Sequence, residues 1–498
     1  MKPAVFPSFV ILLLLLLGGI NEPSFGLNAE AAEPETVQER TDPDPSNESM
    51  EDVLDAFEAH KTREPEKDVL DAFEEAPNPP PENTGSEPTP SRAVSMDGHA
   101  KIGSSWNYAH KAPRNGETDW RDLSRLRAEL QLELEAKLPG SWKTFASGKG
   151  AYDVAYSIQG RDNFTDEVLD NYEKEIELRE LYLMGSIVKS LDLKAGRQIV
   201  VWGRSDNIRV TDVLNPLDMR EPGLTDIEDL RLPVTMTRMD YYFGKWNLSA
   251  LAVHEIRFNK MPEFGSDFYP YGASKIPENS PESRIDNTEF GLALNGVFSG
   301  WDISFYYASV FDDYPHAELV YAGMFPHMEL HHSSIHMGGA AGNIALGNWL
   351  IKTDIAFFEG MQFLNTGKTT FTRIDVLAGL EYFGFADTTV TIEAVNRHLN
   401  EYDQRLKNLP DKIDQDDFQS VLRITKDYFH DTLTVTLLTS LYGFSGQNGA
   451  FGRFSLEYDL SDNWTVLGGI VDYHSGDKPS MSGIGDNDRI YGEIKYSF

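Results

Sequence analysis

Three histidines close together in the sequence form its most enzyme-like cluster. They lie in the segment His331-His332-Ser333-Ser334-Ile335-His336. On a β-strand, His332 and His336 share a face, but at ~3.3 Å per residue they lie about 13 Å apart. A metal ion bonds to nitrogen at about 2.0 Å, so a strand cannot bring both rings to one ion. We therefore expect neither a metal site nor a cofactor.

Serine, histidine and asparagine side chains are also available for an acyl hydrolase set in a barrel wall. The sequence has no Gly-x-Ser-x-Gly elbow, although a barrel enzyme would not need that device. Catalytic triads are recognised by geometry, so hydrolysis stays open as a lesser alternative to a non-enzymatic function. The chain contains no cysteine. Thiol nucleophiles, disulfides, zinc–thiolate sites and lipoprotein anchors are therefore excluded.

Charged residues that alternate with apolar ones give the strongest signal in the sequence. Residues 125–136 read Arg-Leu-Arg-Ala-Glu-Leu-Gln-Leu-Glu-Leu-Glu-Ala, and residues 453–460 and 489–498 alternate in the same way. This period of two is that of a β-strand, and a transmembrane barrel turns the apolar face to lipid and the polar face to its lumen. The charged residues that we expect in the lumen are Arg125, Arg127, Glu129, Arg373, Asp375, Arg453, Glu457, Arg489 and Glu493.

The elements that must position these side chains are strands. We expect an all-β outer-membrane barrel of about 18 antiparallel strands over residues 95–498, with 16 left open. The expected strands are 95–109, 123–137, 148–160, 175–189, 191–203, 233–244, 246–255, 287–297, 300–312, 328–342, 348–359, 370–384, 386–397, 417–429, 431–443, 449–460, 462–473 and 486–498. Connections after even-numbered strands are mostly short, and those after odd-numbered strands are mostly long. This asymmetry is typical of periplasmic turns and extracellular loops.

Aromatic residues support the same interpretation. They flank several short turns, as at Tyr241, Tyr382 and Trp464, and such residues form the interfacial girdle of a membrane barrel. The last strand ends in Tyr496-Ser497-Phe498. A terminal aromatic strand resembles the signal that the barrel assembly machinery recognises, so Tyr496 and Phe498 are expected to serve assembly.

The long loop 204–232 has an unusual composition for an exposed segment. It contains apolar residues such as Val210 and Leu214 and a turn at Asn215-Pro216. We expect it to fold into the barrel mouth, narrow the lumen and pair with wall residues such as Arg179 or Arg373. The alternative is a cap that only shields the rim. The charged residues of this expected constriction are Asp206, Arg209, Asp212, Asp218, Arg220, Asp226, Asp229 and Arg231.

The N-terminal segment has two parts. Residues 1–31 resemble a signal peptide, because the apolar run Phe9–Leu17 is too short to span a membrane. Residues 32–94 form an acidic, proline-rich arm that we expect to be disordered. The phrase Asp-Val-Leu-Asp-Ala-Phe-Glu occurs at 52–58 and again at 68–74. A partner could bind these repeats as short helical motifs, and a plain acidic tail is the alternative. The docking residues would be Val53, Leu54, Phe57, Val69, Leu70 and Phe73.

Four stretches resemble the proteobacterial domain-of-unknown-function family DUF1302. They are Glu175–Leu183, Leu191–Gly203, Asp212–Asp218 and Asp226–Pro233. The resemblance implies an outer-membrane protein, often encoded beside an inner-membrane transporter of the resistance-nodulation-division type. It brings no catalytic residues.

Together these features favour a channel through which a small, poorly soluble molecule is passed or exported. An 18-strand barrel is wide enough for an aqueous path. The alternative is a docking or structural barrel whose arm holds a partner. The expected partners are outer-membrane lipid, the barrel assembly machinery and a periplasmic or inner-membrane transporter component. Nucleic acid is not expected, because the formal net charge is −35.

Overall fold

The computed structural model describes residues 93–113, 118–269, 275–322 and 325–498. The expected signal peptide and the acidic arm up to residue 92, with both of its repeats, lie outside the described residues. In the part of the chain that is described, no helix is long and apolar enough to cross a membrane.

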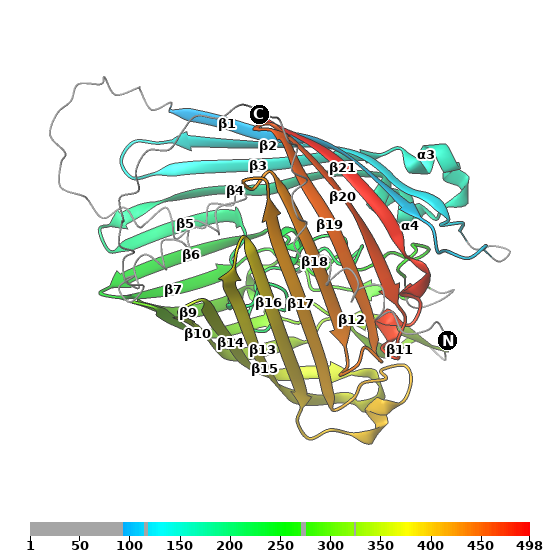
Figure 1. The fold of residues 1–498 in the computed structure, drawn as a ribbon. Coiled ribbons are helices and arrows are strands. Elements are labelled where there is room, and N and C mark those ends of the chain that lie inside the picture. Colours follow the sequence, from blue (N-terminus) through cyan, green and yellow to red (C-terminus); the bar gives the residue numbers. More distant parts are fainter. Residues whose placement is uncertain (1–92, 114–117, 270–274, 323–324) are drawn as a thin grey trace, which may run out of the picture. The chain divides into compact units, whose positions relative to one another are not determined.

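The main element is one 18-stranded antiparallel sheet that closes on itself (Figure 1). It closes because β1 pairs with β2 on one side and with the last strand, β21, on the other. The strands in order round the sheet are β1 (Val94–Asn107), β2 (Asp122–Lys137), β3 (Lys143–Asp153), β4 (Lys174–Val188), β5 (Leu191–Gln198), β6 (Val234–Phe243), β7 (Trp246–Val253), β9 (Glu289–Phe298), β10 (Trp301–Phe311), β13 (Ser334–Leu346), β14 (Trp349–Phe363), β15 (Gly367–Phe385), β16 (Thr388–Leu399), β17 (Asp416–Tyr428), β18 (Leu433–Tyr442), β19 (Gly449–Ser461), β20 (Trp464–His474) and β21 (Arg489–Ser497). The expected strand number and antiparallel barrel are confirmed.

Smaller elements lie in the connections. A separate three-stranded sheet consists of β8 (Glu278–Asn279), β11 (His316–Ala322) and β12 (Phe325–His331). The short helical turns are α3 (Ala155–Gln159), η1 (Arg161–Asn163), α4 (Asp166–Val168), η2 (Leu169–Glu173), α5 (Ile227–Leu230), η3 (Ile285–Asn287), η4 (Leu364–Thr366), η5 (Gln404–Lys407), η6 (Pro479–Met481) and η7 (Ile484–Asp486). The turns between β4 and β5, β6 and β7, and β13 and β14 are short, whereas 199–233 and 254–288 are long loops.

The outer face of the barrel is apolar and exposed. On β2, Leu130, Leu132 and Leu134 are 40–45% exposed, whereas the side chain of Glu129, directly before Leu130, is only 9% exposed. This is the reverse of a soluble β-sandwich, in which the leucines would be buried. Aromatic side chains contact one another beside the short turns, as in the stacked pair Phe298 and Trp301 and the tilted pair Trp349 and Tyr382.

Two of the expected strands differ from the observed ones at the ends that lead into the longer connections, as does the fifth, which is described below with the loop that follows it. The third was expected over 148–160, but β3 ends at Asp153 because its carboxylate accepts the N–H of Ala155 and starts α3. The tenth was expected over 328–342. Here the chain instead leaves β12 at His331, turns, and enters the barrel as β13 only at Ser334.

Candidate functional site

The loop 199–233 begins where β5 ends, earlier than expected. Beyond that point an asparagine of the loop takes the place of a neighbouring strand as hydrogen-bond partner. The fifth strand was expected to continue to residue 203, but it stops at Gln198. Asn215 accepts the N–H of Val200 at 2.8 Å and donates to the carbonyl oxygens of Gln198 and Leu232. Asn215 is fully buried. Its amide therefore holds the two ends of the loop together after the strand pairing has stopped.

One side of this loop packs against the inner wall. Trp202, Ile208, Val210 and Leu214 belong to a buried cluster that also contains inward residues of strands from β6 to β18, such as Met337. Trp202 stacks on Tyr306 of β10 at a centroid distance of 4.9 Å. Without the loop, this inward apolar wall would be exposed to water, which is unfavourable. The loop therefore fills this part of the barrel.

Polar contacts fix the first part of the loop to β10, β14 and β16. The carboxylate of Glu393 on β16 accepts the backbone N–H groups of Asp206 at 2.9 Å and Asn207 at 3.0 Å. Asp206 also forms an ion pair with Lys352 on β14. The Arg204 side chain pairs with Asp302 on β10. Nothing in the sequence marked these inward residues as partners of the loop, because only the folded loop brings them into contact with it.

The far part of the loop contacts the other side of the barrel. Asp226 forms ion pairs with Arg423 on β17, at 3.2 Å, and with Arg453 on β19. The hydroxyl of Tyr473 on β20 donates to the carbonyl of Pro222 at 2.6 Å. Burial raises the pKa of the Asp226 carboxyl, but Arg453 and Arg423 outweigh burial and hold that pKa below its ordinary value.

The loop therefore crosses the whole lumen. Arg220 binds Asp218 within the loop and Glu175 on β4, at 3.1 Å. Strand β4 lies half a circuit round the sheet from β16, which holds the loop through Glu393. A cap on the rim would not reach two opposite walls.

The remaining charged residues of the expected constriction have other positions. Arg209 and Arg231 both pair with Asp212 inside the loop, at 3.4 and 3.0 Å, and Asp229 is exposed in α5. The expected wall partners were wrong. Arg373 pairs with Asp375 on its own strand, and within the described residues Arg179 makes no ion pair with the loop.

The charged side chains of the inner wall differ in how far water reaches them. The expected lumen residues lie on the inner face, but their exposure differs. The side chains of Lys101 on β1, Arg125 on β2 and Glu493 on β21 are 28–31% exposed. Those of Lys352 and Asp375, on β14 and β15, are 7% and 1% exposed. On β17 the side chains of Arg423 and Asp417 are again 30% and 31% exposed, and Arg125 itself pairs with Glu221 of the loop. Water therefore reaches charged residues on more than one part of the inner wall, while the loop covers the apolar wall from β10 to β16.

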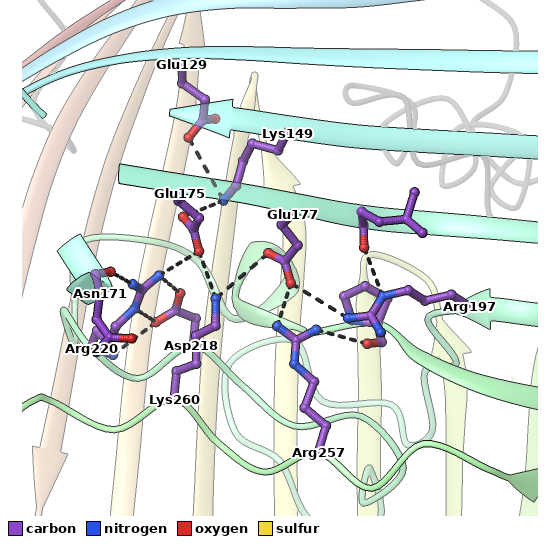
Figure 2. A network of polar contacts seen from close by, with 12 residues as sticks. Glu129, Lys149, Asn171, Glu175, Glu177, Arg197, Asp218, Arg220, Arg257 and Lys260 are labelled. Carbon is purple, nitrogen blue, oxygen red and sulfur yellow. Dashed lines mark hydrogen bonds and ion pairs between the residues drawn. The ribbon is translucent and has the colours of Figure 1, made fainter. Parts of the chain in front are cut away.

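A network of ion pairs links the loops to β2, β3 and β4 (Figure 2). Lys149 on β3 lies 3.4 Å from Glu175 and 4.0 Å from Glu129. Lys260, in the loop 254–288, donates to Glu175 at 2.8 Å. The same lysine forms main-chain hydrogen bonds with Leu217 and Met219, so the two long loops support each other.

The histidine cluster is dispersed. His332 stacks on Phe258 and contacts Glu278 at 3.1 Å, His331 lies 3.4 Å from Glu329, and His336 lies beside Tyr307. Among the residues that the structure describes, no group of three or more histidine or acidic side chains is arranged to hold a metal ion.

A family model described as "Protein of unknown function (DUF1302)" matches residues 78–498. The chain belongs to this family. The DUF1302 match covers every barrel strand, the inward loop and the closing strand, and it confirms the resemblance seen in the sequence. No curated protein matches the chain. Among solved structures, OccK1 (OpdK) of Pseudomonas aeruginosa is similar with a TM-score of 0.48 at 9% identity, covering 81% of this chain and 98% of that chain. OccAB4 of Acinetobacter baumannii is similar with a TM-score of 0.49 at 12% identity, covering 82% and 99%.

Proposed function

We propose that this protein is an outer-membrane channel for a small, poorly soluble molecule, with the loop 199–233 as its constriction. The observation that carries the proposal is that the loop crosses the lumen and still leaves charged residues of the inner wall in contact with water. The loop packs against the apolar wall from β10 to β16, while Lys101 of β1, Glu493 of β21 and Arg423 of β17 remain 30–31% exposed. A charged constriction beside an aqueous path is how channels select what passes.

The first test shortens the loop without removing its packed base. Leu217 and Arg231 form an antiparallel bridge, and Asp218 donates to the carbonyl of Leu230. Replacing residues 221–229 by Gly-Gly therefore keeps the stem and the apolar cluster but removes Asp226. Single-channel conductance of the purified barrel should rise. Unchanged conductance in a folded variant, checked by heat-modifiable gel migration, would place this segment outside the path.

The second test asks where the path runs, and it uses the absence of native cysteines. Gln131→Cys lies on the inner face of β2, whereas Val395→Cys lies on β16 under the loop, where Val395 is 1% exposed. A charged methanethiosulfonate should reduce the conductance of the first variant and leave that of the second unchanged. A folded barrel that does not conduct, either with or without residues 32–94, would replace the channel by a docking or structural role.

We further propose that the acidic arm couples the channel to a periplasmic or inner-membrane transporter component. The support is the repeated Asp-Val-Leu-Asp-Ala-Phe-Glu motif, because two copies of one short motif suit a partner with a groove. The direction of transport would follow from that partner.

A further inference from the structure

The wall of the barrel is incomplete beside β4. Strand β3 pairs with β4 along its length, up to Tyr152 opposite Lys174. On its other side, β4 pairs with β5 only from Leu181, which lies opposite Arg197, because β5 ends at Gln198. Among the described strands, none pairs with residues 174–180 of β4 on this side. We call this unpaired edge the β4 gap.

The β4 gap begins inside the membrane rather than above it. The paired stretch from Leu181 to Val188 climbs only about 18 Å, at ~3.3 Å per residue and a tilt of ~40°, whereas the apolar band of such barrels is about 25 Å tall. Strand β5 has 8 residues, fewer than the roughly 9–11 that a transmembrane strand needs. The upper part of the band is therefore not closed by backbone pairing at this place.

Side chains, rather than a strand, occupy the β4 gap. An open hollow of about 360 Å³ is lined there by residues 175–178 of β4 and by Arg197, Arg257 and Lys260. Arg197 donates from Nε to the carbonyl of Leu178 at 2.9 Å, where a strand partner would otherwise donate. Figure 2 shows Glu177 between the basic groups of Lys260, Arg257 and Arg197. The wall can therefore open here through side-chain contacts alone, with every β-ladder left intact.

The same ion pairs connect the lumen with the outer face. On the inner side, Glu175 contacts Lys149 and Lys260. On the outer side, Arg197 shares the face of its partner Leu181, which is 47% exposed, and forms an ion pair with Glu255. Charged groups on the lipid face of a barrel are unfavourable, so a cluster of them at this place needs a reason.

Apolar side chains stand beside these charges at the outer edge of the β4 gap. Ile176 is 95% exposed and Leu178 is 50% exposed, and both alternate with the inward carboxylates Glu175 and Glu177. The edge therefore offers a basic surface for a polar or acidic head group and an apolar surface for a hydrocarbon tail, in adjacent positions.

We infer that the β4 gap is a lateral portal, through which a single-chain amphipathic molecule with an acidic head group passes between the lumen and the outer leaflet. The inference rests on the proposed channel function and extends it, because a poorly soluble cargo then has a route that avoids water. The head group moves along Arg257, Lys260 and Arg197, while the tail moves past Ile176 and Leu178.

The test compares two inward cysteines in full-length protein in lipid nanodiscs. Ala151→Cys lies directly opposite Glu175, beside the β4 gap. Ser455→Cys is the matched control, because it also lies on the inner face but its strand is paired on both sides there. Each variant reacts with N-dodecylmaleimide, which partitions into lipid, and with a sulfonated maleimide, which stays in water. The ratio of the two rates should be several-fold higher at position 151 than at position 455. Equal ratios would overturn the portal.

A second pair of variants tests the ion pairs. In the Ala151→Cys background, Arg257→Gln should raise the rate ratio further, whereas Arg238→Gln, which disturbs an Arg–Asp pair on β6, should not. A ratio that Arg257→Gln leaves unchanged would contradict a gate at this place. Conductance is measured on the same samples. Normal conductance with equal ratios rejects the portal alone, and a raised ratio without conductance rejects the channel alone.

Discussion

Asn215 accepts the backbone N–H of Val200 at 2.8 Å, and this contact joins the turn of the inward loop to the end of β5. The amide group of Asn215 also donates to the carbonyl oxygens of Gln198 and Leu232. One side chain thus satisfies backbone groups that the loss of strand pairing leaves without partners.

The variant Asn215→Ala should loosen the loop. It leaves three buried backbone groups without partners, which costs about 3–9 kcal/mol in total, since an unsatisfied buried group costs roughly 1–3 kcal/mol. The loop should then become sensitive to limited proteolysis, and conductance should become noisier while gel migration stays normal. Asn163→Ala is the matched control, because it removes one exposed side-chain hydrogen bond. A loop as resistant in Asn215→Ala as in the wild type would contradict this account.

The ion pairs of Asp226 predict how conductance depends on pH. The folded-state pKa of this carboxyl is depressed. Its contribution to holding the loop is therefore complete above the ordinary aspartate pKa of about 3.9, and it is lost only as the pH falls through the lower folded value. Asp226→Asn should conduct more than the wild type by a constant factor across neutral pH.

That factor should shrink only in strong acid, where the wild-type carboxyl also becomes neutral. This ratio is measured by recording the conductance of both proteins in parallel, from neutral pH down to below the ordinary pKa of aspartate. The exposed residue Asp414 supplies a control, Asp414→Asn, which should behave as the wild type does. A difference that already disappears near neutral pH would assign the loop's anchorage to another group.

The barrel could be predicted from the sequence because each strand is recognised from the alternation of its own residues. Alternation along β2 sets which side chains face lipid, and the same rule holds for every strand, so the strand count and order followed. The end of β5 was not predictable in this way. It depends on Asn215, which lies in a different part of the chain and acts only in the folded loop.

The wall partners of the loop were missed for a related reason. Opposite charges alone favoured Arg373, but Asp375 lies two residues away on the same strand face and pairs with it first. Glu393 and Lys352 are ordinary inward residues of their strands, and only the path of the loop across the lumen brings Asp206 to them. The β4 gap likewise becomes visible only in the register of three strands.

The two acidic repeats predict cooperative binding by the arm. Phe57 and Phe73 are the largest apolar residues of the two motifs. Two linked motifs raise the effective concentration of the second binding event, so changing both phenylalanines to alanine should weaken binding by more than the sum of the single changes. Site-specific photocrosslinking from the neighbouring positions Glu58 and Glu74 in living cells, followed by quantification of the partner captured by each variant, measures this. Capture that is unchanged in the double variant would reduce the arm to an acidic tail.

Phe498 predicts a separable role for its ring in assembly. Its backbone N–H donates to the carbonyl of Gly98 at 2.9 Å and its carbonyl accepts from the Gly98 N–H at 3.0 Å, so the last residue closes the barrel through its main chain. Deleting Phe498 would remove both the closing bonds and the ring. Phe498→Ala keeps the bonds and removes only the ring, which is 44% exposed.

If the assembly machinery recognises the ring, Phe498→Ala should lower the heat-modifiable fraction in the outer membrane several-fold. The melting temperature of the barrels that do assemble should not change. Phe385→Ala, at an aromatic that is 53% exposed beside another short turn, is the control and should assemble normally. Equal losses in the two variants would mean that Phe498 acts as one more girdle aromatic and not as an assembly signal.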